Sequence, residues 1–245
     1  QVSAPLLPCL FGTNPWGVHA PRQLRIQALT LVADVDRQTG NVPRAIALFQ
    51  FAFDQAKAAS DVPRFDYFAI GNRLTSALIS TGNISDAKSL AQELYRESQR
   101  AMAAAPADRA LRTVMVLAQL SLAKCEIQLR STEATAVALA ALAAARHAVN
   151  DDPNDVDRRA LLGTALNLAG RVASDAQRQP LLEESTANSA AIAVASPSLT
   201  NLLNYRVDLS DLAAHYLEQG NTTKAWQHCQ TGLALVADIT AKHPQ

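Results

Sequence analysis

One short phrase occurs three times in this chain: a Gly-Asn pair with an alanine five residues after the glycine. Glycine supplies the left-handed backbone conformation that closes a helix, and asparagine either tolerates that conformation or caps the next helix. Helix-like stretches flank every copy, so the phrase predicts the turn of a helical hairpin. The three copies are Gly40–Ala45, Gly82–Ala87 and Gly220–Ala225.

These turns recur with a period. A proline follows each of the three alanines after 18 or 19 residues, and Ala134 has the same relation to Pro153. The four alanines are separated by 42, 47 and 91 residues, and the last gap equals two periods with one degenerate unit inside it. A period of this length is typical of stacked helical repeats. The sequence therefore predicts about five antiparallel helical hairpins.

The fold class expected from this pattern is all-α. β-branched residues do not alternate with polar ones, and aromatic residues make up only 5% of the chain, so strand signals are nearly absent. In the fourth hairpin, which lacks a Gly-Asn turn, we expect the break between its helices at Gln179-Pro180. The predicted helices span residues 22–38 and 43–60, 64–80 and 85–104, 107–130 and 132–150, 155–178 and 181–195, and 198–219 and 222–242.

The first 21 residues differ from the rest. Four prolines make residues 1–21 an extended leader, followed by a helical domain over residues 22–245. Leucines, Phe11 and Trp16 make the leader too apolar to stay in water, so we expect it to cap the first hairpin or to connect to an upstream domain. Because the chain starts at Gln1 rather than at methionine, we expect a processed protein or a piece of a longer one.

The composition indicates which classes of partner and which cellular compartment are expected. A formal net charge of zero argues against nucleic acid, and no apolar run reaches the length of roughly 20 residues that a membrane-inserted helix needs. The three cysteines form no CxxC pair, which favours a reducing compartment such as the cytoplasm over the periplasm. Arginine outnumbers lysine, which indicates a GC-rich coding sequence and a bacterial source.

Small residues are expected to bring the helices of a hairpin together. In the first unit Ala45, Phe49 and Ala52 alternate small and large side chains on one helix face. In the last unit Ala225, Cys229 and Gly232 share a face, and this spacing predicts that they point towards Tyr216 on the partner helix.

The first and last units resemble tetratricopeptide repeats (TPR). The residues that carry the resemblance are Leu212-Ala213-x-x-Tyr216-x-x-x-Gly220-x-x-x-x-Ala225 and Gly40-x-x-x-x-Ala45-x-x-x-Phe49-x-x-Ala52. The third and fourth units depart from the family pattern, with Leu129 and Ala173 where glycine is expected, and the units are about two turns longer than the standard repeat.

The resemblance implies a right-handed α-solenoid whose first helices line a concave surface that binds a peptide or a partner protein. The family's groove-facing positions fall on polar side chains of the first helices, and Arg159 or Arg112 would bind a carboxylate. These positions, each with an ordinary solvated helix face as its alternative, are Gln27, Thr30, Asp34, Arg37, Asn72, Ser76, Arg112, Gln119, Glu126, Arg159 and Asn167.

Elongated repeats of this kind are similar to those fused to bacterial signalling proteins, including regions C-terminal to serine/threonine kinases. The residues that suggest this are Arg158-Arg159-Ala160-Leu161 and Asn167-Leu168-Ala169-Gly170. The alternative function is therefore a regulatory module of a larger signalling enzyme, such as a kinase or a transcriptional regulator, with other domains of the same polypeptide as partners.

Signals for catalysis or metal binding are weak, and a helical enzyme is the remote alternative. The acidic stretch 151–157 has no central glycine and no terminal glutamate, so a helix cap explains it better than calcium. His215, His228 and Cys229 lie on one hairpin, but we expect Cys229 and His228 to point in different directions, so that they would not bind one metal ion together. Cys125 and His147 could act as a nucleophile and its base, but Cys125 falls at a core position, which favours a structural role. We expect no metal, no cofactor and no enzymatic activity.

Overall fold

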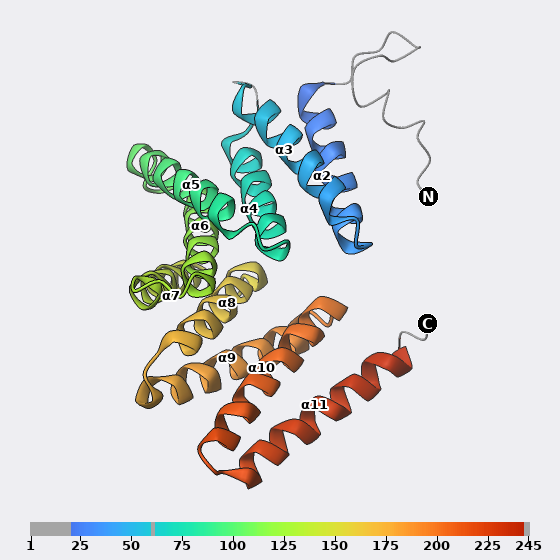
Figure 1. Ribbon diagram of the computed structural model, residues 1–245, viewed down its shortest axis with the longest axis vertical. Coiled ribbons are helices and arrows are strands. Elements are labelled where there is room, and N and C mark those ends of the chain that lie inside the picture. Colours follow the sequence, from blue (N-terminus) through green and yellow to red (C-terminus); the bar gives the residue numbers. More distant parts are fainter. Residues whose placement is uncertain (1–20, 60–61, 243–245) are drawn as a thin grey trace. The chain divides into compact units, whose positions relative to one another are not determined.

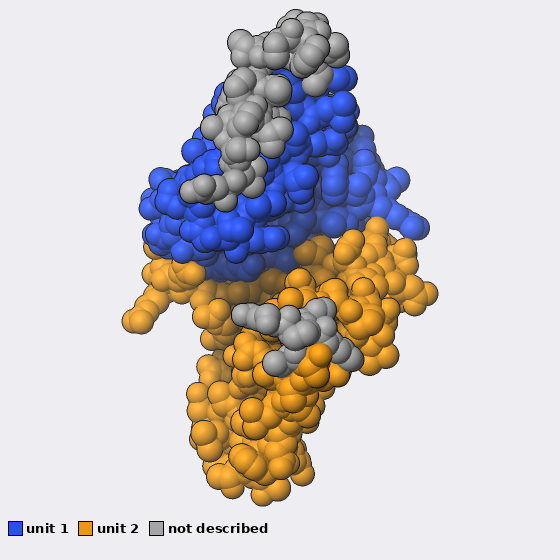
Figure 2. All heavy atoms as spheres, turned by 90° about the vertical axis from the view of Figure 1, so that its right-hand side faces the viewer, with its two compact units in different colours: residues 1–125 blue, residues 126–245 orange. Residues whose placement is uncertain are grey.

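The computed structural model describes residues 21–59 and 62–242, and within these ranges every regular element is an α-helix (Figure 1). The all-α prediction is confirmed. The predicted leader lies, apart from Pro21, outside the described residues. The chain divides into two compact units, residues 1–125 (unit 1) and residues 126–245 (unit 2), which Figure 2 shows in different colours. The boundary falls near the end of the fifth helix of the described part.

Unit 1 contains two complete hairpins and most of a further helix. Its helices α2 and α3 pack together, as do α4 and α5, and α3 also packs on α4. Its core runs continuously through all of these helices and is centred on aromatic side chains of α3 and α4. The helices are α2 (Arg22–Gln38), α3 (Val42–Lys57), α4 (Arg64–Ser80), α5 (Ile84–Ala104) and α6 (Arg109–Gln128).

Unit 2 holds the remaining helices, each packed on the next: α7 on α8, α8 on α9, α9 on α10 and α10 on α11. On α7 the buried face consists mainly of alanines, which let neighbouring backbones approach closely. The five helices are α7 (Ala134–Asp151), α8 (Val156–Val172), α9 (Asp175–Ala195), α10 (Leu199–Glu218) and α11 (Thr222–Lys242).

The three Gly-Asn phrases form the predicted turns. Gly40, Gly82 and Gly220 have φ angles of 86°, 80° and 74°, which lie in the left-handed region. In the first turn the amide of Asn41 donates to the carbonyl of Asp36 at 2.7 Å, and the other two turns repeat this bond. Such bonds satisfy carbonyls at the helix C-terminus that have no partner within the helix.

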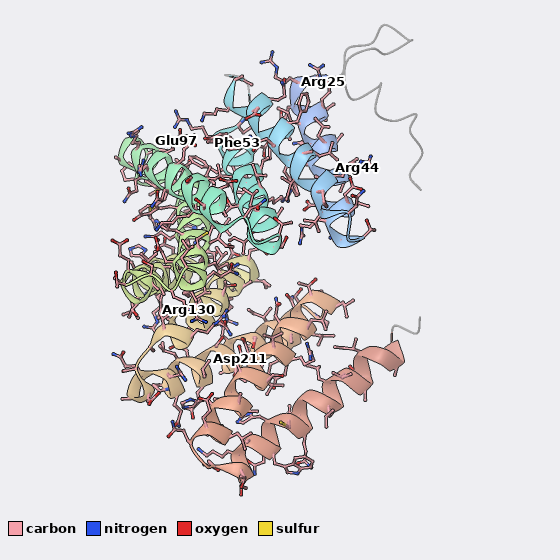
Figure 3. All side chains as sticks on the ribbon, in the orientation of Figure 1. Arg25, Arg44, Phe53, Glu97, Arg130 and Asp211 are labelled. Carbon is pink, nitrogen blue, oxygen red and sulfur yellow. The ribbon has the colours of Figure 1, made fainter. Side chains whose placement is uncertain are left out.

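The turn between α6 and α7 has the same geometry without a glycine. Arg130, labelled in Figure 3, has a φ of 51° and is the one non-glycine residue of the described chain with a positive φ. The next amide, of Ser131, donates to the carbonyl of Glu126 at 3.0 Å, as asparagine does in the glycine turns. The expected glycine position was therefore Arg130 rather than Leu129, and an arginine occupies the strained conformation there.

The break in the fourth hairpin was predicted at the wrong place. Helix α8 ends at Val172 and α9 begins at Asp175, so Pro180 lies inside α9 rather than before it. The amides of Gln177 and Arg178 both donate to the carbonyl of Ser174 at 2.9 Å, and Arg178 also reaches Glu218 of α10 at 3.3 Å. These contacts lie in the first turns of α9, and Pro180, which follows them, removes one helical hydrogen bond.

Packing in the first hairpin follows the predicted order. Ala45, Phe49 and Ala52 are each fully buried, which confirms the alternation of small and large side chains. In the last hairpin the prediction was partly wrong, because Cys229 is exposed and a Cβ added to Gly232 would meet no atom within 4 Å. The face of α11 that covers Tyr216 is rotated by about one residue, so that His228 stacks on its ring.

Candidate functional site

Polar side chains join successive first helices within unit 1. Asp34 of α2 pairs with Arg73 of α4 at 3.2 Å, and Asn72 of α4 accepts a hydrogen bond from Ser121 of α6 at 3.4 Å. The members of the two pairs are 39 and 49 residues apart in sequence, close to one repeat period. The first helices of this unit therefore lie side by side and share a row of polar groups.

Unit 2 has an equivalent contact. The side-chain amide of Asn167 on α8 donates to Asp211 of α10 at 2.7 Å, and Figure 3 shows Asp211 on α10. A second acidic residue of α10, Asp208, is buried and accepts from Ser185 of α9 at 3.1 Å. Burial raises the pKa of Asp208 above its ordinary value, although the serine hydrogen bonds oppose this rise.

Ion pairs join successive second helices in the same way. Lys57 of α3 pairs with Glu93 of α5, and Arg146 of α7 pairs with Glu184 of α9 at 2.6 Å. These side chains are about half exposed. Such pairs are worth up to about 1 kcal/mol each, so they set the register between repeats more than they stabilise them. Within each unit, side-chain pairs thus join first helices to first helices and second helices to second helices, in addition to the contacts between the two kinds of helix.

The predicted site residues divide into two groups by burial. Seven of them are accessible, fully or in part, while Thr30, Asn72, Gln119 and Glu126 are buried. Thr30 and Asn72 bond to carbonyls of their own helices at 2.8 and 3.1 Å, and Gln119 donates to Tyr95 at 2.9 Å, so these groups serve the packing of the repeats. The accessible ones are Gln27, Asp34, Arg37, Ser76, Arg112, Arg159 and Asn167.

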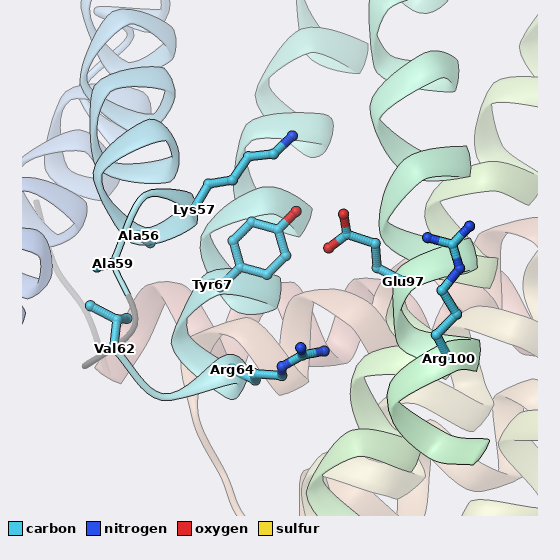
Figure 4. A pocket seen from close by; sticks show the side chains of 8 residues that line it. All are labelled: Ala56, Lys57, Ala59, Val62, Arg64, Tyr67, Glu97 and Arg100. Atoms are coloured by element: carbon cyan, nitrogen blue, oxygen red, sulfur yellow. The ribbon is translucent and has the colours of Figure 1, made fainter. Parts of the chain in front are cut away.

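A pocket that the sequence did not indicate lies in unit 1. It has a volume of about 630 Å³ and is bounded by α3, α4 and α5. Figure 4 shows Tyr67 of α4 between Lys57 on one side and Glu97 on the other, with the hydroxyl pointing into the space between them. No motif marks this pocket, because its lining combines the ends of three helices. The lining residues are Ala56, Lys57, Ala59, Val62, Arg64, Tyr67, Glu97 and Arg100.

A second, shallower cleft of about 370 Å³ lies in unit 2 around Tyr216. The Tyr216 hydroxyl donates to Glu183 of α9, the Lys224 ammonium lies 4.9 Å above the Tyr216 ring, and His228 stacks on that ring at 5.5 Å. Hydrogen bonds from Tyr216 and Gln179 lower the pKa of Glu183, and burial raises the pKa of Tyr216 to about 12. These mutually satisfied groups clamp α9, α10 and α11 together.

The acidic stretch at the start of α8 is a helix cap. The carboxylate of Asp155 accepts from the amides of Asp157 and Arg158 at 2.9 and 3.1 Å. Cys125 is fully buried, as its core position predicted, and His147 is exposed on α7 beside Asp151. No group of three or more histidine, cysteine or acidic side chains in the described ranges could hold a metal ion.

No protein-family model matches the chain, and no curated protein matches its sequence. Several solved structures are similar in fold. BtubC (BKLC) from P. vanneervenii is 16% identical, with a TM-score of 0.64 over 91% of this chain and 85% of that chain. TTC0263, a thermophilic TPR protein of Thermus thermophilus, is also 16% identical, with a TM-score of 0.52 over 86% and 91% of the two chains.

A third similar structure is the Rap conjugation gene regulator of the plasmid pLS20 in complex with the Phr* peptide. It is 10% identical, with a TM-score of 0.59 over 87% of this chain and 54% of that chain. Together with the helix pairs and turns described above, these likenesses show that the chain has a TPR-like helical-repeat fold, an all-α solenoid. Within the described ranges, none of the helices is both long and apolar enough to cross a lipid bilayer.

Proposed function

We propose that the chain is a non-enzymatic scaffold that binds an extended peptide or a segment of a partner protein along the first helices of one of its units. The observation that carries this proposal is that each unit has accessible polar side chains on its first helices. In unit 1 these form a row that includes Gln27, Arg37 and Ser76, and in unit 2 they include Arg159.

The chemistry of the row suits an extended backbone. A peptide in that conformation presents unpaired N–H and C=O groups, which glutamine and serine bond as both donor and acceptor. Arginine adds charge-assisted bonds to carboxylates. Asp34 is held by Arg73 at 3.2 Å, so part of the row is already ordered in the free chain. Less side-chain entropy is then lost on binding.

The Rap regulator supports the proposal, because it shares the fold and its structure contains a peptide. The proposed binding mode on this chain rests on the side chains above rather than on that likeness.

The test is a selection of displayed peptides against the full chain, followed by fluorescence anisotropy with the selected peptide. Arg37→Gln and Arg159→Gln each remove one guanidinium from a first helix, in unit 1 and unit 2 respectively. Loss of one charge-assisted hydrogen bond of about 1.5–3 kcal/mol weakens binding by roughly 10- to 100-fold. The matched control is Arg96→Gln, because Arg96 is exposed on the second helix α5. Equal affinity of all three variants would reject the first helices as the binding surface.

The regulatory-module alternative has less support. Of the residues that suggested it, Arg158 is buried, donates to the carbonyl of Ala148 at 3.0 Å and pairs with Asp155 at 3.2 Å, and Asn167 bonds Asp211. Packing within unit 2 therefore explains those residues without a larger signalling enzyme. The sequence of the full-length gene would test this alternative directly.

A further inference from the structure

The last hairpin of unit 2, formed by α10 and α11, carries large apolar side chains on the surface of both helices (Figure 1). On α10 the exposed positions recur every three or four residues, which places them on one side of the helix. Two small exposed side chains, Ser210 and Ala214, continue that side. The large exposed side chains are Leu199, Leu203, Val207 and Leu217 on α10, and Trp226 and Leu233 on α11.

These eight side chains, which we call the outer face, lie on the side of the hairpin that is turned away from α9. On α10 they are opposite the buried Asp208, which accepts a hydrogen bond from a serine of α9. On α11 Trp226 and Leu233 are seven residues apart and therefore share one side of the helix. The opposite side of α11 carries His228, which lines the cleft shared with α9.

The outer face lacks the polar groups that a terminal surface needs. None of its side chains is charged, and Trp226 and Leu233 are 61% and 64% exposed. In a helical-repeat array each hairpin covers its neighbour, and a terminal hairpin needs a polar outer side to stay soluble. On α11 no charged residue stands between Lys224 and Asp238. An exposed apolar surface of this kind marks an interaction site.

We propose that the outer face binds the outer face of a second copy of the chain, so that the protein forms a two-fold symmetric dimer. Helices α10 and α11 have 20 and 21 residues, which makes each about 30 Å long. Two such helices side by side, each about 10 Å wide, present about 600 Å² in projection. This area is close to the roughly 800 Å² that each partner of a stable complex buries.

The chemistry of the outer face suits contact with itself. A two-fold axis places the same patch on both sides of an interface, so a charged patch would meet its own charges. The outer face has no charge to repel its copy. Homodimer interfaces are more apolar than transient ones, and tryptophan is among the residues that contribute most to binding. Ser210 and Ala214 are small, which lets a large side chain of the second copy approach the α10 backbone.

This dimer is independent of the proposed peptide binding. The variants that test the scaffold, Arg37→Gln and Arg159→Gln, change residues outside the outer face. Either proposal can therefore fail without the other.

The experiment is sedimentation velocity of the full chain at concentrations of about 1–100 μM, a range that covers micromolar dissociation constants. We expect the mass to rise with concentration from 26.2 kDa towards twice that value. Leu233→Glu keeps a good helix former at an exposed position and brings an unpaired charge into the interface, and Trp226→Ala only truncates the side chain. Each should weaken dimerisation by about tenfold or more. The matched control is Leu31→Glu, because Leu31 of α2 is 66% exposed and lies outside the outer face.

Thermal unfolding supplies a second readout, because dimerisation makes the melting temperature depend on protein concentration. The melting temperature of the parent chain should rise with concentration, and that of Leu233→Glu should not. A single species of 26.2 kDa over the whole range would overturn the proposal and would mean that something other than a second copy covers the outer face. A dimer that neither outer-face variant weakens would also overturn it. So would equal dissociation by Leu31→Glu, since the contact would then involve α2 rather than two outer faces.

Discussion

Replacing Arg130 by glycine is expected to stabilise the protein. Arg130 occupies the same left-handed position as the glycines of the other helix-ending turns, with a φ of 51° against 80° at Gly82. A non-glycine residue in that conformation lowers stability by roughly 1–2 kcal/mol. Glycine avoids this strain, but it loses about 0.5–1 kcal/mol more conformational entropy on folding than other residues do. The net gain for Arg130→Gly is about 0.5–1 kcal/mol.

The opposite substitution, alanine for a glycine at such a turn, measures the cost of the left-handed backbone conformation by itself. A Cβ added at Gly82 would meet no atom within 4 Å, so Gly82→Ala loses stability through its backbone conformation alone. Its expected cost is about 1 kcal/mol. For a chain of 245 residues, 1 kcal/mol corresponds to about 2–4 °C in melting temperature.

The assay is urea denaturation followed by circular dichroism, with a constant m-value as the check that only stability has changed. Arg130→Ala is the control, because it removes the arginine side chain and keeps the strained conformation, and it should match the parent within about 0.5 kcal/mol. A midpoint for Arg130→Gly below that of the parent, or no loss in Gly82→Ala, would refute the strain argument.

Further changes test the packing and the electrostatics. Gly71→Ala places a Cβ 2.7 Å from a methyl of the buried Leu94, and the resulting overpacking should lower stability by about 1 kcal/mol net of the helix propensity gained, as read from urea midpoints. Gly232→Ala is its counterpart, in open space within α11, and should raise stability by about 0.5–1 kcal/mol; a loss there would mean that the glycine is needed for packing. Ala45→Leu overfills a fully buried site and should cost roughly 1–3 kcal/mol, whereas a neutral result would contradict the tight first hairpin. Glu183 has a folded-state pKa below its ordinary value of 4.5, so it stabilises the fold above that pH, and this stabilisation is lost as the pH falls through the lowered pKa. The melting temperature of Glu183→Gln should therefore depend less steeply on pH in this acidic range than that of the parent chain. Parallel curves for the two proteins would disprove the linkage.

The local structure of this protein was largely predictable from its sequence. The Gly-Asn turns and the alternation of Ala45, Phe49 and Ala52 depend on neighbours within a few residues. Helix α2 begins and ends where the sequence predicted, at Arg22 and Gln38, because its flanking residues are a proline and a helix-closing turn. Short-range preferences of this kind act on the chain before any tertiary contact forms.

Contacts between repeats could not be predicted, because they depend on how each helix is rotated about its axis. A rotation of about one residue exposes Cys229 and places His228 on Tyr216. Helix α9 continues through Pro180, and an ion pair between Arg178 and Glu218 joins its first turns to α10. The sequence by itself therefore determined the all-α hairpins and the three Gly-Asn turns, but not the turn within the fourth hairpin. The tertiary structure alone decided which polar residues are buried and how three helix ends enclose the pocket around Tyr67, because these features join residues that are distant in the sequence.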